Sequence, residues 1–388
     1  MKSQLSSSDD DEVDAYPSSP LVTSCWWRSA AKFEECARLK HGFPNISSLT
    51  PRLRLFRELE RLALIAHEGL NELRYKLQIY RSGDYWVPTG GLKKEEMDIP
   101  PIVTILLVGF SSSGKSSLVN LMYSVLGRTG LVLFAQTKSG SGKKNYTTMF
   151  MEEHNVLRSI KSGFCVYDSR GFNYDKVGEA LEELSSWMSD GVHHNQLCLR
   201  SGDHNVLLKD IDAEQLSSRN SSKFIQRRVN CAMVVVNVAE VYKALKAGDS
   251  KPLEATKELF CSSALRNCNE NPILILTHGD LLTSEERIEG RLKICESLGI
   301  SETNGIYDVV CLTEYGFLAE ESDPVSAYNV AEAVYRALLI SDREHLPKKT
   351  LQDWTLFILS WLMSLMAIFF AFLAQICSAL GHSNKLKR

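Results

Sequence analysis

An uncharged stretch near the end of the sequence limits most strongly what this chain can fold into. From Trp354 to Gly381, 28 consecutive residues include no Asp, Glu, Lys or Arg. A helix of this length extends about 42 Å, more than the hydrocarbon core of a bilayer at about 30 Å. Because soluble proteins seldom bury so long an apolar helix, the sequence predicts one transmembrane tail anchor over residues 352–381, which contacts the membrane through residues 354–381.

The position of this segment predicts where the rest of the chain lies. Seven residues follow it, and the first residues lack the basic start and apolar run of a secretory signal. We therefore expect a single-pass protein with its N-terminal body in the cytosol. The membrane would be the endoplasmic reticulum or the outer membrane of a mitochondrion or plastid. Basic residues near the two ends of the segment are equal in number, so the positive-inside rule does not decide the orientation.

The charges outside this segment exclude some classes of function. The chain has 44 basic and 47 acidic residues, a net charge of −3, without the basic excess of a nucleic-acid-binding protein. Residues 1–24 are rich in Ser and Asp and are predicted to be a disordered acidic head. The ten cysteines form no C-x-x-C pair, which is typical of buried thiols in a reducing compartment.

Residues 50–81 have the pattern of one long helix, within a helical segment predicted over residues 25–95. Thr50 can cap the helix, and Pro51 suits its first turn. Apolar residues recur at steps of three and four and form one stripe, which comprises Leu55, Leu59, Leu62, Ala66, Leu70, Leu73, Leu77 and Tyr80. The favoured interpretation is that the stripe packs on the chain's own domain. The alternative is contact with a second copy or a partner protein.

Residues 100–345 alternate between short apolar runs and helix-like stretches. The runs are Ile102–Val108, Phe164–Tyr167, Ala232–Val238, Pro272–Leu276 and Tyr307–Leu312. The helix-like stretches are Ser116–Leu126, Lys176–Met188, Pro252–Leu265, Ser284–Leu298 and Pro324–Leu339. Runs that are apolar throughout indicate a mostly parallel sheet with helices on both faces. The sequence therefore predicts a doubly wound α/β domain, with a mobile loop at 128–148 and a surface insertion or lid at 190–228.

The stretch Gly109–Ser116 reads GFSSSGKS and matches the phosphate-loop pattern G-x-x-x-x-G-K-[ST], between an apolar run and a helical stretch. Glycine at 109 and 114 lets backbone N–H groups turn toward phosphate oxygens. Lys115 supplies a positive charge, the Ser116 hydroxyl can bind Mg²⁺, and the helix N-terminus adds its dipole. The predicted phosphate-binding residues are Gly109, Ser111, Ser112, Ser113, Gly114, Lys115, Ser116 and Ser117. A similar sequence at 140–143 follows no strand and is interpreted as loop.

A second motif, Asp168–Gly171, directly follows an apolar run. At a strand end beside a phosphate loop, the Asp168 carboxylate can hold Mg²⁺ through water, and the Gly171 N–H can contact a γ-phosphate. The two motifs together resemble the pattern of P-loop GTPases, which implies a Thr between them that also binds the metal. Thr147 and Thr148 are the candidates, and Thr148 is preferred, so the predicted metal-site residues are Ser116, Thr148 and Asp168.

A third motif, Thr277–Asp280, reads THGD after another apolar run. It resembles the [N/T]-K-x-D motif that P-loop GTPases have at this place, where a carboxylate accepts two hydrogen bonds from the N1–H and amino group of guanine. Adenine lacks that pair of donors, so such a carboxylate discriminates between the two bases. His278 stands where a Lys stem would stack on the base, and an imidazole can stack as well. We predict guanine recognition by Asp280 with Thr277 and His278.

The order of GFSSSGKS, DSRG and THGD resembles that of the translation-factor-related P-loop GTPases, over roughly residues 102–340. Within that class the chain is similar to septin-like and chloroplast-import-receptor proteins, some of which have the same His and a C-terminal membrane anchor. It also resembles interferon-inducible GTPase-like proteins. The resemblance implies a P-loop G domain that binds GTP and Mg²⁺.

Several residues depart from this pattern. Many GTPases have a Gln after the DxxG glycine to orient the attacking water, and Phe172 cannot do so. Ser111 can crowd the γ-phosphate, and Cys311–Glu314 match the last guanine motif poorly. These departures predict slow intrinsic hydrolysis. A partner, a second copy, or an arginine of the insertion could supply the missing group, although such arginines are usually only solvated; the candidates are Arg200, Arg219, Arg227 and Arg228.

The sequence thus predicts a membrane-anchored GTP-binding protein or GTPase switch, with no catalytic residue assigned. One alternative is a non-hydrolysing GTP-binding membrane scaffold that uses the 50–81 helix for partners. The other is a P-loop nucleotide kinase or ATPase with 190–228 as its lid, which the Thr277–Asp280 motif disfavours.

Overall fold

The computed structural model describes residues 25–31, 33–34, 49–88, 91–127, 134–135, 148–157, 163–200, 225–266, 271–310, 323–348 and 351–385. Several predicted features lie outside these residues: the head at 1–24, Thr147, the sequence at 140–143, Arg219 and Cys311–Glu314. By its contacts the chain divides into two units, Met1–Tyr85 with Pro100–Glu344, and Trp86–Ile99 with His345–Arg388.

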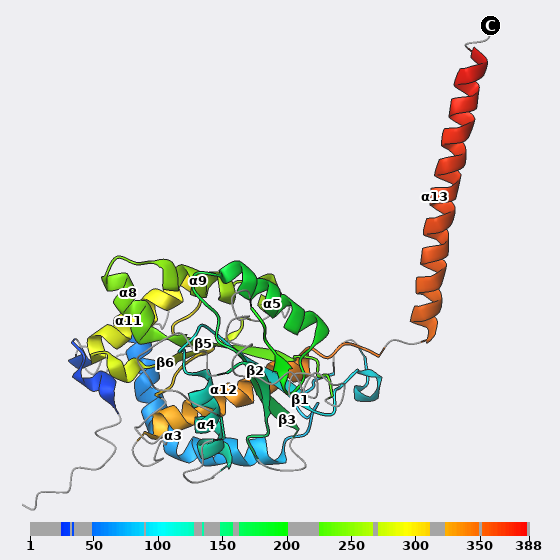
Figure 1. Ribbon diagram of the computed structural model, residues 1–388. Coiled ribbons are helices and arrows are strands. Elements are labelled where there is room, and N and C mark those ends of the chain that lie inside the picture. The colour runs from blue at the N-terminus through cyan, green and yellow to red at the C-terminus, as the bar shows by residue number, and fades with distance from the viewer. Residues whose placement is uncertain are drawn as a thin grey trace, which may run out of the picture. The chain divides into compact units, whose positions relative to one another are not determined.

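The larger unit is built on a seven-stranded sheet in the order β4-β2-β3-β1-β5-β6-β7. Figure 1 shows the sheet with helices packed around it. The strands are β1 (Val103–Val108), β2 (Phe150–His154), β3 (Phe164–Asp168), β4 (Gln196–Leu197), β5 (Cys231–Asn237), β6 (Ile273–Thr277) and β7 (Ile306–Asp308). Five adjacent strands are parallel, in the order β3, β1, β5, β6 and β7. Strand β2 pairs antiparallel with both β3 and β4. The prediction of an α/β class with a mostly parallel sheet is confirmed.

Helices cover both faces of this sheet, as the alternation along β1 shows. Val103, Ile105 and Leu107 belong to one buried cluster and Leu106 and Val108 to another, because successive strand residues point to opposite faces. The first cluster includes residues of α3 (Pro51–Ile79), α4 (Lys115–Gly127) and α12 (Pro324–Arg343). The second includes residues of α5 (Val177–Asp190), α8 (Val238–Lys246), α9 (Lys251–Phe260), α10 (Ser263–Arg266) and α11 (Ser284–Leu298).

The order of the strands reverses at one point in the sheet. Strand β1 lies between β3 and β5. The strands β2, β3 and β4 are therefore added on one side of β1, and β5, β6 and β7 on the other. In open parallel sheets, ligands bind beyond the carboxyl ends of the strands at such a reversal. The residues that follow β1, β3 and β6 at this edge begin with Gly109, Ser169 and His278, so all three sequence motifs meet there.

Some elements differ from those predicted. The two strands β2 and β4 and the helix α8 were not predicted, and the helix predicted at Pro252–Leu265 breaks into α9 and α10 around Cys261. Strand β2 reads FMEEH, and its two acidic residues interrupt the apolar run that would indicate a strand. Helix α8 follows β5 without a loop because the side chain of Asn237, the last residue of that strand, caps it by accepting from Glu240 N at 3.0 Å.

The long helix α3 packs inside the larger unit. Thr50 caps it as predicted, and the residues of its apolar stripe are buried, from Leu55 to Tyr80. Part of the stripe joins the cluster under the sheet, and Leu55, Leu59, Leu62 and Ala66 pack with Trp27 of η1 (Trp26–Ser29). The favoured interpretation of the stripe is therefore confirmed. Any partner of α3 would contact its outward face, where Leu64, Tyr75 and Ile79 are exposed.

The smaller unit combines a short segment with the C-terminal helix. Residues Lys94–Glu96 form η4, and Met97 pairs with Pro347. Helix α13 (Leu351–Lys385) contains Trp354–Gln375, a stretch with a mean hydropathy of 2.5 and no side chain buried. Among the described helices it alone is long and apolar enough to span a membrane.

Candidate functional site

The loop that follows β1 curls into a compact turn. Ser113 N donates to Phe110 O at 3.2 Å, and Leu118 N to Gly114 O at 2.8 Å, so the turn runs directly into α4. Gly114 has a φ of +89°, which only glycine adopts without strain. A Cβ at Gly109 would collide with the Val235 carbonyl of the neighbouring strand. Both glycines of the motif are therefore required by the backbone.

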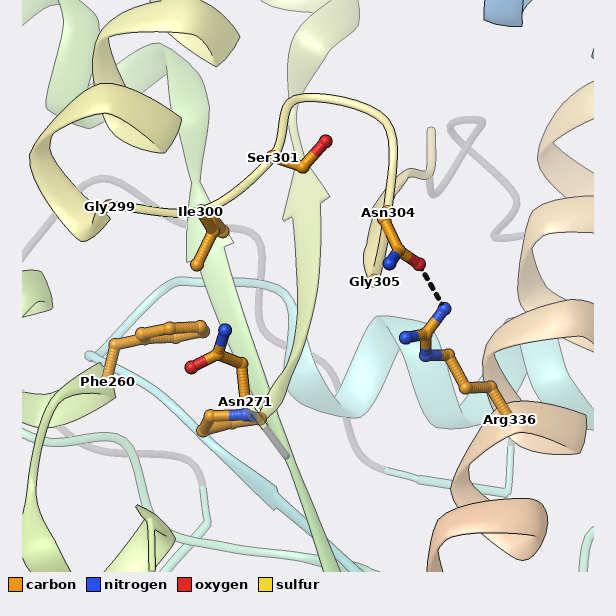
Figure 2. Close-up of a pocket in the computed structure, with 9 residues that line it drawn as sticks. Phe260, Asn271, Gly299, Ile300, Ser301, Asn304, Gly305 and Arg336 are labelled. Carbon is orange, nitrogen blue, oxygen red and sulfur yellow. Dashed lines mark hydrogen bonds between the residues drawn. The ribbon is translucent and has the colours of Figure 1, made fainter. Parts of the chain in front are cut away.

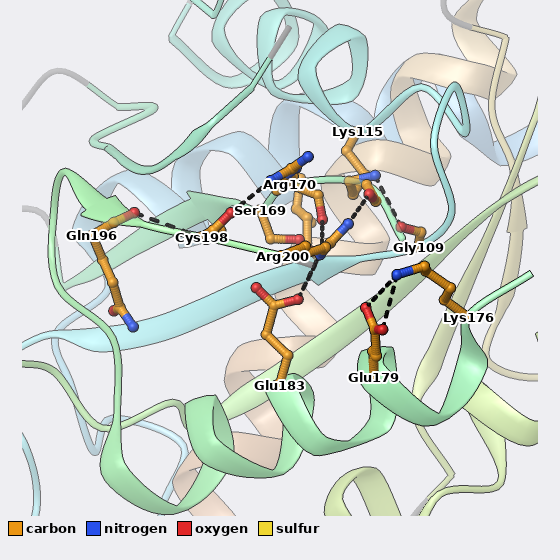
Figure 3. Close-up of polar contacts among 12 residues, drawn as sticks. Gly109, Lys115, Ser169, Arg170, Lys176, Glu179, Glu183, Gln196, Cys198 and Arg200 are labelled. Carbon is orange, nitrogen blue, oxygen red and sulfur yellow. Dashed lines mark hydrogen bonds and ion pairs between the residues drawn. The ribbon is translucent and has the colours of Figure 1, made fainter. Parts of the chain in front are cut away.

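Lys115 is folded back over this turn. Its Nζ donates to Gly109 O and Phe110 O, both at 3.1 Å, and lies 3.4 Å from Ser113 Oγ (Figure 3). Only 6% of the residue is exposed. This burial lowers the pKa of Lys115 to about 8, against the opposing effect of the Asp168 carboxylate. A cation held by neutral carbonyls in a buried place is a strong attractor for an anion.

The three predicted metal-site residues lie together. Ser116 Oγ donates to Asp168 Oδ2 at 2.5 Å and lies 3.4 Å from Thr148 Oγ1. Asp168 is 1% exposed, and its Oδ1 is buried without a hydrogen-bond partner among the described residues. Burial raises the pKa of Asp168, and nearby Lys115 opposes this rise. The group offers hard oxygen atoms, one of them unpaired, as Mg²⁺ prefers.

Gly171 and Phe172 lie against the turn. Ser111 N donates to Phe172 O at 2.8 Å, and Phe172 N donates to Gly109 O at 3.0 Å, so the two segments pair like a short parallel ladder. A Cβ at Gly171 would lie 2.6 Å from Ser111 Cα and 3.1 Å from Lys115 Nζ. The DSRG motif therefore requires glycine at this position because the loop approaches its backbone closely.

The side chain of Phe172 points away from the turn, into the core. It is 1% exposed, stacks on Trp187 at 5.7 Å between ring centroids, and meets Phe110 edge to face at 6.4 Å. Arg200 lies over its other side, 5.1 Å from the ring centroid. Phe172 thus serves as an anchor of the DSRG segment.

Two of the arginines named as candidate catalytic groups are not simply solvated. Arg200 donates to Gly171 O at 2.5 Å and pairs with Glu183 at 2.9 Å, and its side chain is 11% exposed (Figure 3). Arg227 pairs with Glu153 at 2.9 Å, away from the turn. Solvation is therefore the wrong interpretation for Arg200, because a carboxylate and a carbonyl hold it beside the DSRG segment.

The THGD motif contacts the same turn from the β6 side. Thr277 is fully buried, and its Oγ1 donates to Ser113 O at 2.7 Å. His278 adopts a left-handed backbone with φ 57°, and its Cε1 lies within 3.2 Å of where a Cβ at Gly114 would be. Burial lowers the pKa of His278, which keeps the imidazole neutral, and Asp280 opposes this effect. Asp280 itself is exposed at the start of η5 (Gly279–Leu281).

A buried ion pair supports this motif from behind. Arg287 donates to both carboxylate oxygens of Asp308, at 2.9 and 2.6 Å, and both side chains are almost fully buried. The Trp26 ring lies 3.9 Å from the guanidinium carbon of Arg287. A Cβ at Gly279 would collide with Arg287, so the third letter of THGD must be glycine. Sequence reasoning missed this role because Trp26 and Asp308, which hold Arg287, lie far from it in the chain.

The structure also contains a pocket that the sequence did not predict, of about 400 Å³ (Figure 2). It lies before β6 and β7, at the opposite end of these strands from Thr277. Arg336 and Asn304 point toward each other across it, with Nη1 and Oδ1 2.5 Å apart. Its polar lining residues are all at least partly exposed, so it lacks the buried polar groups of the first site.

No protein-family model matches the chain, and no curated protein matches it at a significant level. Within the described residues no group of three or more His, Cys, Asp or Glu side chains is arranged to hold a metal ion. The candidate magnesium site differs from such a group because hydroxyls supply two of its three side chains. Functional conclusions for this chain therefore come from its own residues.

Proposed function

We propose that this chain is a membrane-anchored protein that binds GTP with Mg²⁺ at the turn between β1 and α4, in a P-loop G domain. One observation carries the proposal: the Ser116 hydroxyl lies within hydrogen-bond distance of both Thr148 and Asp168, next to a buried Lys115. These residues come from three separate segments, and no local rule of structure brings them together. A charged, phosphate-sized site at the switch point of the sheet accounts for this convergence.

The residues fit the metal that a nucleoside triphosphate brings with it. Ser116 and Asp168 would hold Mg²⁺, Asp168 through the oxygen that now lacks a partner, and Thr148 lies close enough to join them. Bound there, Mg²⁺ would neutralise phosphate charge. Lys115 would turn from the loop carbonyls to the phosphates, and the backbone amides of Ser112 and of residues 114–116 would surround them.

The base would lie on the β6 side. Asp280 is exposed, so its carboxylate is free to accept hydrogen bonds from a ligand, and neutral His278 lies between it and the turn. Arg287, which pairs with buried Asp308, packs its side chain against Gly279 of this motif. This arrangement supports guanine over adenine.

The position of Phe172 favours slow or absent hydrolysis. Its side chain is buried against Trp187 and Phe110, and no side chain of the described DSRG segment takes the place of a water-orienting Gln. This observation favours, as a second candidate, a GTP-binding scaffold that does not hydrolyse its ligand. Both candidates share the same binding site and the same anchor, Trp354–Gln375 in α13, with the body on the cytosolic side.

The test is nucleotide binding and turnover by the full chain, purified in detergent micelles or in liposomes. We expect GTP to bind more tightly than ATP and to bind more weakly when EDTA removes Mg²⁺. Slow release of phosphate from GTP would support the GTPase, and tight binding without release would support the scaffold. A preference for ATP, or phosphate transfer to a nucleotide, would contradict the proposal and favour a P-loop kinase or ATPase.

A further inference from the structure

Arg200 occupies a place that the proposed binding site does not yet explain. It follows β4, yet its guanidinium reaches the segment that follows β3 (Figure 3). Nη1 donates to Gly171 O at 2.5 Å, Nη2 to Arg170 O at 3.3 Å, and Nε to Glu183 Oε2 at 2.9 Å. One side chain therefore holds two successive carbonyls and is itself held by a carboxylate of α5.

This contact determines the direction of one backbone amide. In a trans peptide the carbonyl of one residue and the N–H of the next point in opposite directions. By holding Arg170 O, Arg200 orients the N–H of Gly171, which donates to no acceptor among the described residues. The same glycine lies against the turn, since a Cβ there would be 3.1 Å from Lys115 Nζ. The amide is thus both oriented and unpaired beside the cation of the proposed phosphate site.

The charge of Arg200 also reaches that site. Its Nη1 contacts Gly171 O at 2.5 Å, and a Cβ on the same glycine would lie 3.1 Å from Lys115 Nζ, so both cations flank this residue. A fixed second cation near Lys115 favours ligands with more negative charge, and the γ-phosphate is the charge that distinguishes GTP from GDP.

We propose that Arg200 is a positioning residue that acts through the Gly171 amide to select a nucleoside triphosphate over the diphosphate, with Glu183 holding it in place. The inference rests on the proposed function, because it assigns a role at the same site. It also gives the polar segment after β4 a direct connection to the state of the nucleotide, through one side chain.

The test compares two affinities in the full chain in detergent micelles, one for a fluorescent non-hydrolysable GTP analogue and one for fluorescent GDP. We expect Arg200→Ala to weaken binding of the triphosphate analogue about tenfold and to leave GDP within about twofold. Arg200→Lys should fall between, because an ammonium cannot hold two carbonyls and a carboxylate in one plane. The matched control is Arg227→Ala, which removes another partly buried Arg–Glu pair, away from Gly171, and should leave the affinity ratio unchanged.

Glu183→Gln provides a second variant that keeps a neutral acceptor for Arg200, so the inference stays testable if Arg200→Ala does not fold. We expect a smaller fall in the ratio of the two affinities, in the same direction. If the folded variants keep the wild-type ratio of triphosphate affinity to GDP affinity, whether or not both affinities fall, the role of Arg200 is overturned while the proposed function stands. A wild-type chain that binds neither nucleotide would overturn both.

Discussion

The proposed site has a phosphate end and a base end. The side chains at the two ends differ in how deeply they are buried and in how many contacts fix their position. At the phosphate end, Lys115, Asp168 and Phe172 are buried. Lys115 bonds to the carbonyls of its own turn, whereas Asp168 and Phe172 contact segments from elsewhere in the chain. At the base end, Thr277 is buried, but the carboxylate that would read guanine, that of Asp280, is exposed on a three-residue turn.

This difference follows from the two chemical tasks. Phosphates are recognised by charge and by backbone N–H groups, which a rigid turn can orient in advance. A base is recognised by one pair of hydrogen bonds, which an exposed carboxylate can form once the ring lies beside it. Changes at the phosphate end should therefore affect all nucleotides and the stability of the fold, whereas changes at the base end should affect only the choice of base.

Lys115→Met should have the largest effect, because it removes the only buried ammonium among the described residues of the phosphate end. We expect GTP, GDP and ATP all to bind about 100-fold more weakly, as expected when a charged hydrogen bond is lost. Titration with fluorescent nucleotides measures this. Lys293→Met, which removes an exposed lysine paired with Glu289, is the control. Normal GTP binding by Lys115→Met would place the site elsewhere.

Gly171→Ala tests the close packing of the phosphate end. Its Cβ would lie 2.6 Å from Ser111 Cα, so backbone must shift, and we expect the free energy of unfolding to fall by about 2 kcal/mol. Chemical denaturation of the full chain in micelles measures it. Gly178→Ala is the matched control, since no atom lies within 4 Å of the added Cβ in α5, and this change should not destabilise. Equal stabilities would show that the loop is loosely packed.

Asp280→Asn should change the choice of base and leave the phosphate end intact. The amide of Asn donates where the carboxylate accepts, so we expect GTP to bind about tenfold more weakly and xanthosine triphosphate to bind more tightly. Competition between the two nucleotides measures the shift. The unfolding free energy should change little, because Asp280 is exposed. An unchanged GTP affinity would remove Asp280 from the base site.

Glu240→Gln should have the smallest effect, at a partly buried carboxyl group of α8. Burial raises the pKa of Glu240, and its Oε2 has no hydrogen-bond partner among the described residues. A carboxyl with a raised pKa keeps its proton longer when folded, so its contribution to stability falls as the pH rises from about 4 toward neutrality. Gln does not ionise. The melting temperature of Glu240→Gln should therefore exceed that of wild type at pH 7 and equal it near pH 4, whereas exposed Glu258→Gln should show no such difference.

The parts of the fold that the sequence predicted correctly are those with strong local patterns. The apolar runs around Val103–Val108 and Ile273–Thr277 and the stripe of α3 need only their own residues to be recognised. Strand β2 was missed because its Glu152 and Glu153 interrupt the apolar pattern, and it is defined instead by its pairing with β3. Arg200 was named only as one of four arginines, since nothing near it in sequence shows that it contacts Gly171.

By itself, the sequence determined the α/β class, the two glycines of the turn, and an apolar helix long enough to span a membrane. Each of these depends on residues a few positions apart, whose spacing sets backbone geometry or burial directly. Only the tertiary structure decided that Ser116 meets Asp168, 52 residues away, that Phe172 is an anchor in the core, and that Arg200 contacts Gly171. Contacts of this kind depend on the order of the strands, which brings distant segments to one edge of the sheet.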